Sequence, residues 1–379
     1  MNDTPLATHR NAFGFVRFVL ASLVIVAHTP ELTDGTRDRE LFSALFGSTT
    51  FGGIAVDGFF LISGFLITGS FLSSRSWTSY LKKRIIRIFP GFLAAYFLCI
   101  FIVALLAGGR LPHGTFEIVR VITDAAFLQA PRSIDVFAGT PYPVLNGSVW
   151  TISYEFRCYL LLLALGMASL LRSRRFIVAA AILFTILALC VPTHSYRPFS
   201  PNAVATELTT LQYIRFAIIG DHRQLVRFIQ IFLTGACFFV FRDRLRFPAW
   251  AMVVAGIALV AGCFSTVFVH IAVAVFGGYL ILAFAFLNND NVFARINNKE
   301  DISYGLYLSA WPIEKLLIWW LPGLPLLLLG LATFVLATCY GWLSWQLIER
   351  PVIERSRTRR RTPVIATGAT DTRSDAPID

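Results

Sequence analysis

Ionisable side chains interrupt the apolar stretches of this chain, and their types point to acid–base chemistry. Arg17 and His28 flank the ten residues FVLASLVIVA, in which Ser22 is the only polar side chain. An arginine at mid-bilayer costs roughly 2.5–3.5 kcal/mol on insertion scales. Eleven residues make about three helical turns, so both side chains leave one helix face, roughly 16 Å apart along the axis. Such a pair indicates a helix that lines a polar path.

Two carboxylates enter other apolar stretches. Asp57 stands in VDGFFLISGFLI and Glu155 in GSVWTISYEFR, each near the outer, non-cytoplasmic end of its run. Since His28 also occupies an outer end, we predict that the three side chains converge near the outer third of the membrane. An imidazole that takes a proton and a carboxylate that orients it form a general-base site. The alternative is a structural role for His28, but ionisable groups inside membrane segments commonly mark function.

A basic segment lies at the inner edge of the third apolar stretch. In KKRIIRIFP, Arg84 and Arg87 share a helical face just before Pro90, which we expect to open the third span. The spacing alone favours simple anchoring of a cytoplasmic loop. The functional alternative is a phosphate clamp, because guanidinium groups bind phosphates in pairs.

The composition places these residues in a membrane. Hydrophobic residues make up 56% and charged residues 15% of the 379 residues, which is too little charge for an ordinary soluble protein. We predict an all-α integral membrane protein with about ten transmembrane helices. The predicted spans are 12–29, 52–72, 88–108, 150–171, 176–191, 226–241, 249–264, 267–287, 302–321 and 324–348.

The basic residues orient these spans. Most of the 33 Lys and Arg residues fall in alternate connecting segments and in the C-terminal tail, and cytoplasmic loops carry such an excess. We therefore predict that the N- and C-termini are both cytoplasmic. The net charge of +11 then indicates attraction to anionic membrane lipid, and no binding of nucleic acid is expected.

The spans group into one membrane domain, residues 1–354, followed by a cytoplasmic tail, residues 355–379, that is first basic and then disordered. Two long outer loops, residues 109–149 and 192–225, either bind something on the outer side or only connect the spans. All six cysteines fall in predicted spans, one in each, so we expect neither a disulfide framework nor a metal site.

Six motifs, in this order, resemble the membrane-bound acyltransferase family 3, the O-acyltransferases that modify bacterial surface and secreted carbohydrates. The resemblance covers nearly the whole membrane domain. The motifs are the pair Arg17 and His28, DGFFLISGF from Asp57, RIIRIFP from Arg84, SVWTISYE from Ser148, DISYGLYL from Asp301 and LIERP from Leu347.

The resemblance implies ten core membrane helices in a bacterial inner (plasma) membrane. It implies an acyl-CoA donor, usually acetyl-CoA, supplied from the cytoplasm, and a carbohydrate or glycolipid hydroxyl as acceptor. By the same resemblance, His28 is the base or a transient acyl carrier, with Arg17 as its partner, and Arg84 and Arg87 hold the phosphates of coenzyme A. Asp57 and Glu155 match family positions without a settled role.

One segment departs from the family pattern. Many relatives carry a histidine before the proline that follows the tyrosine-rich motif, whereas this chain reads LSAWP, with Ala310 and Trp311 before Pro312. The alanine side chain neither donates nor accepts a hydrogen bond, so any role of that histidine is absent here. Glu314 and Lys315 follow closely and either supply polarity or pair with each other.

Two other classes of function stay open from the sequence. A transporter or flippase for a lipid-linked or polar solute predicts broken helices in matched halves, and we find no such match. A non-catalytic scaffold or receptor leaves the embedded Arg17 and His28 unexplained. Consumption of acetyl-CoA by the purified protein separates an enzyme from a transporter. A His28→Ala protein that folds and retains full function would favour a scaffold over an enzyme.

Overall fold

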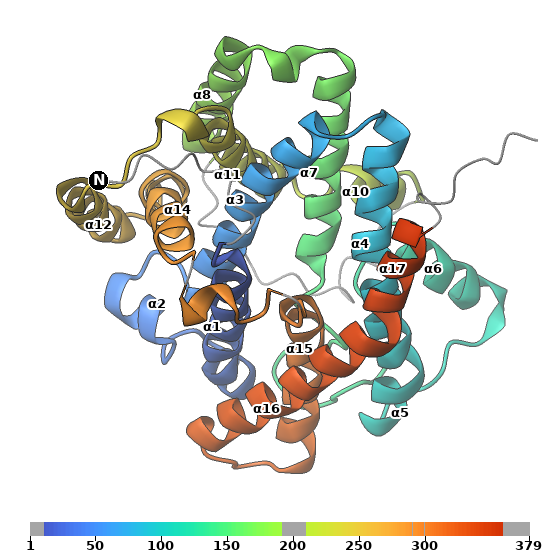
Figure 1. Cartoon of the computed structure of the whole chain (residues 1–379). Helices are drawn as coiled ribbons and strands as arrows, with labels where there is room; N and C mark the ends of the chain where they lie inside the picture. The colour runs from blue at the N-terminus through green and yellow to red at the C-terminus, as the bar shows by residue number, and fades with distance from the viewer. Residues whose placement is uncertain (1–10, 192–209, 290, 299, 359–379) are drawn as a thin grey trace, which may run out of the picture.

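The computed structural model describes residues 11–191, 210–289, 291–298 and 300–358, and this part of the chain is helical with no strand (Figure 1). The predicted all-α class is therefore confirmed. The predictions made for residues 192–209 and 359–379 lie outside the described residues. The principal helices are α1 (Phe13–Asp34), α3 (Phe51–Leu72), α4 (Trp77–Leu98), α7 (Trp150–Met167), α8 (Arg174–Cys190), α11 (His222–Val240), α12 (Ala249–Cys263), α14 (Gly278–Leu287), α15 (Ser303–Trp320) and α16 (Leu326–Ser344).

Shorter elements join or extend these helices. Turns of π-helix continue α4 into α5 (Ala104–Leu106), α13 (Val269–Ala272) into α14, and α16 into α17 (Arg350–Thr358). Other short helices are α2 (Leu41–Phe46), α6 (Gly114–Ala126) and α10 (Thr210–Ile219). Turns of 3₁₀-helix cover Leu170–Arg172, Arg242–Arg244 and Val292–Ala294.

Within the described residues, six helical segments are long and apolar enough to cross a membrane. They are Phe13–Asp34, Phe51–Leu72, Trp77–Leu106, Arg215–Val240, Val269–Leu287 and Leu326–Ser356. Helices α7, α8, α12 and α15 occupy the other four predicted spans but are shorter or less apolar. The protein is thus a helical membrane protein, while the count of ten spans and the sides of the termini stay predictions.

The start of the third span differs from the prediction. Pro90 does not open a helix but lies inside α4, which begins at Trp77. The side-chain oxygen of Ser76 accepts a hydrogen bond from the backbone N–H of Ser79, at 3.1 Å, and so caps the earlier start. Hydropathy marks only the apolar part of a helix, and the polar turns that carry Arg84 and Arg87 precede that part.

The centre of the bundle depends on close contact between α3 and α11. A Cβ atom on Gly64 of α3 would lie 2.0 Å from the carbonyl oxygen of Phe232, and one on Gly235 of α11 would lie 2.2 Å from that of Leu61. Only glycine fits at such a distance. Helix α3 also contacts α1 and α7, and α1 contacts α15. In Figure 1, α12 and α6 lie at opposite edges of the bundle, and these four helices and α11 lie between them.

The loop 109–149, the first of the two that are predicted to be outer, is partly helical. It contains α6, whose Glu117 side chain accepts hydrogen bonds from Arg110 and from the backbone N–H of His113. These bonds hold the pKa of the Glu117 carboxyl well below its usual range, at about 2. The loop then returns to the bundle, where Asn146 donates a hydrogen bond of 2.7 Å to the carbonyl oxygen of Leu308. It is therefore a packed part of the protein.

Candidate active site

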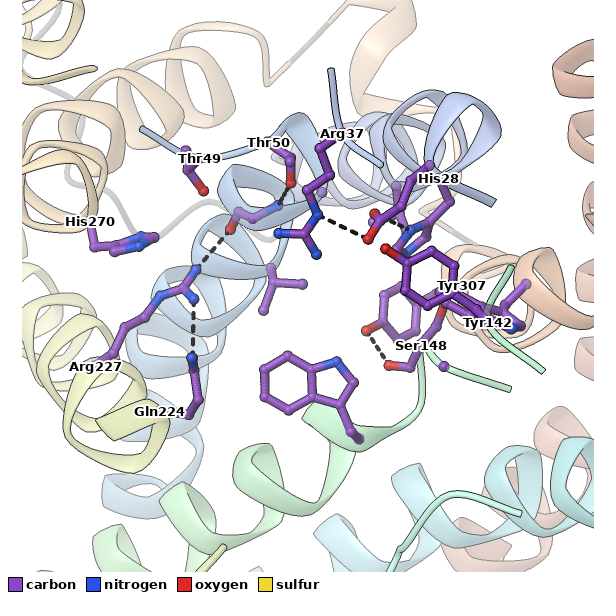
Figure 2. A pocket seen from close by; sticks show the side chains of 18 of the residues that line it. His28, Arg37, Thr49, Thr50, Tyr142, Ser148, Gln224, Arg227, His270 and Tyr307 are labelled. Atoms are coloured by element: carbon purple, nitrogen blue, oxygen red, sulfur yellow. Dashed lines mark hydrogen bonds and ion pairs between the residues drawn. The ribbon is translucent and has the colours of Figure 1, made fainter. Parts of the chain in front are cut away.

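Two polar cavities lie within the bundle. The first, which we call the His28 pocket, has a volume of about 260 Å³ (Figure 2). Its walls come from α1, α3, α7, α11, α13 and α15, from the segment that joins α1 to α3 and from the end of the 109–149 loop. Its principal polar and aromatic residues are His28, Glu31, Arg37, Tyr142, Ser148, Trp150, Gln224, Arg227, His270, Tyr307 and Trp311.

A carboxylate on the same helix orients His28. Its Nδ1 lies 3.3 Å from Oε2 of Glu31, three residues further along α1. The other oxygen of the buried Glu31 accepts a hydrogen bond of 2.9 Å from Nε of Arg37. With Nδ1–H directed to Glu31, the lone pair of Nε2 is left for a substrate proton. The ring of Trp311 stands edge-on to the imidazole, 4.8 Å between centroids, and limits its rotation.

Asp57 contacts other residues around the pocket and not His28 itself. It is fully buried, and its two oxygens contact Arg227 and His270 rather than His28. The distances are 2.6 Å from Arg227 Nη2 to Oδ1 and 2.6 Å from His270 Nδ1 to Oδ2. Both partners line the His28 pocket, so Asp57 stands behind its wall. Asp57 thus lies near the pocket of His28 but does not contact His28 itself.

Glu155 lies in the second cavity. Its Oε1 accepts hydrogen bonds from Ser63, at 2.7 Å, and from Tyr159, at 2.5 Å. Trp150, at the start of α7, reaches the His28 pocket, and five residues further on the helix has advanced by about 7.5 Å. Glu155 is therefore too deep to join His28, and the predicted convergence of three groups does not form.

The second cavity, which we call the Arg84 pocket, has a volume of about 420 Å³. It is lined mainly by α1, α3, α4, α7 and α15, and also by α17. Its polar residues are Arg17, Ser63, Ser70, Lys83, Arg84, Arg87, Glu155, Tyr159, Tyr304 and Ser356. Arg17 thus lines this cavity while His28 lines the other one, and the two ends of α1 serve different pockets.

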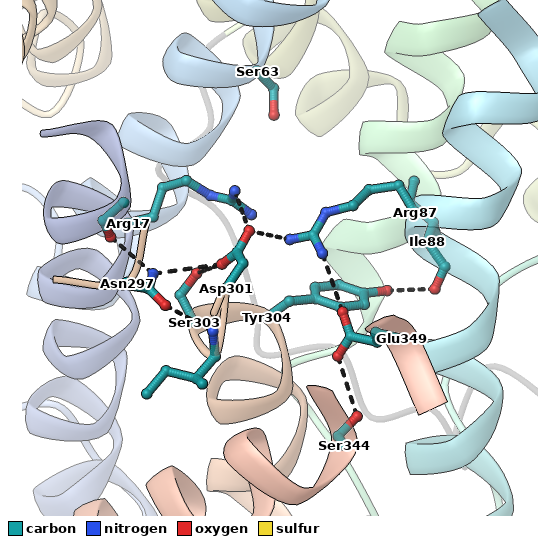
Figure 3. A network of polar contacts seen from close by, with 12 residues as sticks. Arg17, Ser63, Arg87, Ile88, Asn297, Asp301, Ser303, Tyr304, Ser344 and Glu349 are labelled. Carbon is teal, nitrogen blue, oxygen red and sulfur yellow. Dashed lines mark hydrogen bonds and ion pairs between the residues drawn. The ribbon is translucent and has the colours of Figure 1, made fainter. Parts of the chain in front are cut away.

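The arginines of this cavity differ in how they are bound. Arg17 donates a hydrogen bond of 2.5 Å to Asp301, and Arg87 donates to the same carboxylate oxygen (Figure 3). Arg87 also pairs with Glu349, at 3.1 Å, in the π-helical turn that joins α16 to α17. Burial alone would raise the pKa of the Asp301 carboxyl, but the charges of Arg17 and Arg87 lower it to about 2.

Arg84 stands apart from that network. Its Nη2 donates a hydrogen bond of 3.3 Å to Ser70, and its guanidinium lies 5.9 and 5.8 Å from the ring centroids of Tyr80 and Tyr159. Its buried Nε makes no hydrogen bond in the structure. Arg84 therefore keeps hydrogen-bonding capacity for an anion, whereas Arg87 is committed to two carboxylates.

The segment that departs from the family pattern is buried in α15. Trp311, next to Ala310, supplies the ring against His28. Lys315 donates to the 109–149 loop, at 2.7 Å to Thr140 Oγ1 and 2.5 Å to the carbonyl oxygen of Pro141. Glu314 is fully buried, and neither carboxylate oxygen has a hydrogen-bond partner in the structure. Lys315 thus ties α15 to the loop.

Four ionisable residues of the His28 pocket were not predicted from the sequence: Glu31, Arg37, Arg227 and His270. For Glu31 a signal was present, because His28 and Glu31 are spaced i,i+3 on one helix. Arg227 and His270 gave no local signal. Among the described residues no group of three or more His, Cys, Asp or Glu side chains is arranged to hold a metal ion.

The helical bundle and its two cavities define a membrane protein with a candidate site for proton transfer and a candidate site for an anion. Sequence comparison supplies the family: a model described as "Acyltransferase domain" matches residues 10–346. The chain belongs to this family, acyltransferase family 3, and the predicted membership is confirmed.

Two curated relatives align over most of the chain. One is an "O-acetyl transferase" of Shigella phage Sf6, 28% identical over 352 residues, which covers 91% of this chain and 97% of the relative. The other is "Nodulation protein 10" of Rhizobium leguminosarum bv. viciae, 28% identical over 382 residues, which covers 91% and 94%. No solved structure matches. The protein is therefore an enzyme, a membrane-bound O-acyltransferase.

Proposed function

We propose that this enzyme moves an acyl group, most simply acetyl, from cytoplasmic acyl-CoA to a hydroxyl of a cell-envelope or secreted carbohydrate. The setting is the inner membrane of a bacterium. One observation carries the proposal: a single bundle holds a basic cavity and, beyond it, a cavity with an oriented imidazole. An acyl transfer from a phosphate-bearing donor needs both.

The Arg84 pocket is the proposed donor site. Coenzyme A carries phosphates, and a guanidinium with an unused N–H binds phosphate well. Arg84 is such a group, and Lys83 lines the same cavity. Arg87 contributes to this site by its charge and by fixing the cavity wall, since its own hydrogen bonds go to Asp301 and Glu349.

The pantetheine arm would then lead from the Arg84 pocket to the His28 pocket. Helix α15 supplies Tyr304 to the first and Tyr307 to the second, about 4.5 Å further along the axis. Helix α3 supplies Ser63 to the Arg84 pocket and Val56 to the His28 pocket. At the helical rise of about 1.5 Å per residue these two positions are about 10 Å apart. The separation is one to two helical turns, which an extended arm spans.

The proposed chemistry uses His28 as the base, with Glu31 as the group that positions it. Nε2 of His28 takes the proton of the acceptor hydroxyl, the hydroxyl oxygen attacks the thioester carbonyl, and the C–S bond breaks. The leaving thiolate of coenzyme A then receives the proton. In the alternative route, Nε2 of His28 attacks the thioester and the thiolate of coenzyme A leaves. The acceptor hydroxyl then attacks the acyl-imidazole, His28 is released, and the proton of the hydroxyl ends on the thiolate. A trapped acyl adduct on His28 would decide between the routes.

The experiment uses membrane vesicles from a deletion strain that carries the wild-type or a variant protein, supplied with acetyl-CoA labelled in the acetyl group. We expect labelled, alkali-labile ester on glycan with the wild type. We expect little with His28→Ala, and a raised KM for acetyl-CoA with Arg84→Ala. The matched control is Arg75→Ala, because Arg75 is exposed and lines neither pocket.

Normal transfer by His28→Ala at wild-type protein level would overturn the base assignment. Normal KM in Arg84→Ala would overturn the donor site. If the wild-type protein moves a solute and consumes no acetyl-CoA, the transporter or flippase alternative is right and the proposal is wrong. Mass spectrometry of surface glycans from the deletion strain would identify the acceptor, because an O-acetyl group would be missing.

A further inference from the structure

The wall of the His28 pocket opposite His28 carries a second imidazole, His270 (Figure 2). Its Nδ1 lies 2.6 Å from Oδ2 of Asp57. The other oxygen of Asp57 accepts two hydrogen bonds from Arg227, at 2.6 and 3.0 Å. Asp57 is fully buried, whereas His270 and Arg227 both reach the cavity.

This arrangement fixes which nitrogen of His270 faces outward from the pair. A carboxylate held by a guanidinium accepts hydrogen bonds, so Nδ1 of His270 carries the proton and donates it to Asp57. Nε2 then has a free lone pair and no proton. His28 is built in the same way, with Nδ1 directed to Glu31. One cavity of about 260 Å³ thus holds two imidazole–carboxylate pairs on opposite sides.

We propose that His270 is a second substrate-contacting residue, whose Nε2 accepts a hydrogen bond from a hydroxyl of the acceptor. This proposal rests on the proposed function and deepens it. His28 removes the proton of the reacting hydroxyl, while His270 binds another hydroxyl and sets which one faces the thioester. Two acceptor nitrogens in one small cavity suit a ligand that carries several hydroxyl groups, and a sugar is such a ligand. Gln224 and Arg227 line the cavity beside His270 and add N–H donors for the oxygen atoms of the sugar.

If His270 had a purely structural role, a different nitrogen of its side chain would matter. In that case the Asp57–Arg227–His270 cluster would only join α3, α11 and α13, and the Nδ1 contact alone would matter. Asparagine and glutamine separate the two roles. The amide N–H of asparagine takes the place of Nδ1–H, and the amide oxygen of glutamine takes the place of the Nε2 lone pair. His270→Asn therefore keeps the contact with Asp57, and His270→Gln keeps the acceptor toward the cavity.

The test measures transfer of labelled acetyl from acetyl-CoA to the endogenous glycan in membrane vesicles, per amount of folded protein. We expect His270→Asn to lower transfer by about tenfold or more, the loss of one substrate hydrogen bond, with the KM for acetyl-CoA within about twofold. We expect His270→Gln to retain more transfer than His270→Asn. Thermal unfolding in detergent measures the folded fraction of each variant.

Transfer by His270→Asn equal to or above that of His270→Gln would overturn the proposal and assign a structural role. Transfer near the wild-type rate in both variants would also overturn it. His28→Ala is run in parallel to separate this inference from the function it rests on. An inactive His28→Ala beside a fully active His270→Asn removes only the role of His270, whereas a fully active His28→Ala removes the proposed function.

Discussion

The two cavities of this enzyme use charge in opposite ways. At the wall of the Arg84 pocket, permanent charges form ion pairs: Asp301 pairs with Arg17 and Arg87, and Arg87 pairs with Glu349. In the His28 pocket, each imidazole faces the cavity and has a carboxylate behind it. Groups that keep their charge suit binding and holding, whereas an imidazole gains and loses a proton near neutral pH. The comparison suggests a division of labour between donor binding and proton transfer.

The contrast extends to how each cavity is fixed in place. The ion-pair network joins elements that are far apart in the chain, since Arg87 and Glu349 are separated by 262 residues. His28 and Glu31 lie three residues apart on one helix. A substitution in the ion-pair network should therefore lower the stability of the whole bundle. A substitution in the His28–Glu31 pair should lower only the rate of the reaction.

The largest expected effect is at the base. His28→Ala should lower acyl transfer by about 10²–10⁴-fold, the usual contribution of a general base, and leave the unfolding temperature in detergent nearly unchanged. His113→Ala is the matched control, because His113 is an exposed histidine with a side chain 72% accessible. A His28→Ala protein that unfolds at lower temperature in proportion to its lost activity would remove the contrast between the cavities.

The second effect should fall on stability. Asp301→Asn leaves Arg17 and Arg87 with a neutral partner. Because these ion pairs are partly buried, we expect a cost between about 1 kcal/mol, as for an exposed pair, and about 3 kcal/mol, as for a buried one. We expect a lower unfolding temperature and less protein in the membrane. Glu354→Gln serves as the control, since it alters an exposed pair with Arg350 and should change little. Wild-type stability of Asp301→Asn combined with lost activity would place Asp301 in the reaction instead.

The third effect tests whether Glu31 acts through His28. Glu31→Gln should lower kcat by about 10- to 100-fold, because a hydrogen bond to a charged group contributes about 1.5–3 kcal/mol. The KM for acetyl-CoA should not change, since Glu31 lies outside the Arg84 pocket. A raised KM with unchanged kcat would mean that the two cavities do not divide the work as proposed.

Much of the fold could be predicted from the sequence, because a membrane helix can be identified from its local hydrophobic composition. Each of the ten predicted apolar spans overlaps a helix, and the error at Pro90 arose where the apolar run was shorter than the helix. The site was harder to predict. Asp57 meets Arg227 and His270, which are 170 and 213 residues away, and nothing in a single sequence shows such pairs.

Depth within the membrane was a second source of error. The apolar run that begins near Glu155 predicts a place in the outer third, yet the Glu155 carboxylate lies beside Ser63 and Tyr159 in the other cavity. Five residues of helix advance by about 7.5 Å, which is enough to change cavity. The predicted span begins at residue 150, as α7 does, so the error lies in treating a residue five positions inside the helix as part of its outer end.

The smallest effect concerns the kind of cation in the Arg84 pocket. Arg84→Lys keeps the charge but loses the planar fork that binds phosphate through two N–H groups, so we expect the KM for acetyl-CoA to rise about two- to tenfold with kcat unchanged. Arg84→Ala should raise the KM further. Steady-state kinetics over a range of acetyl-CoA concentrations measures both constants. If Arg84→Lys instead lowers kcat at unchanged KM, Arg84 would act at the reacting atoms, and the boundary between a binding cavity and a proton-transfer cavity would have to be redrawn.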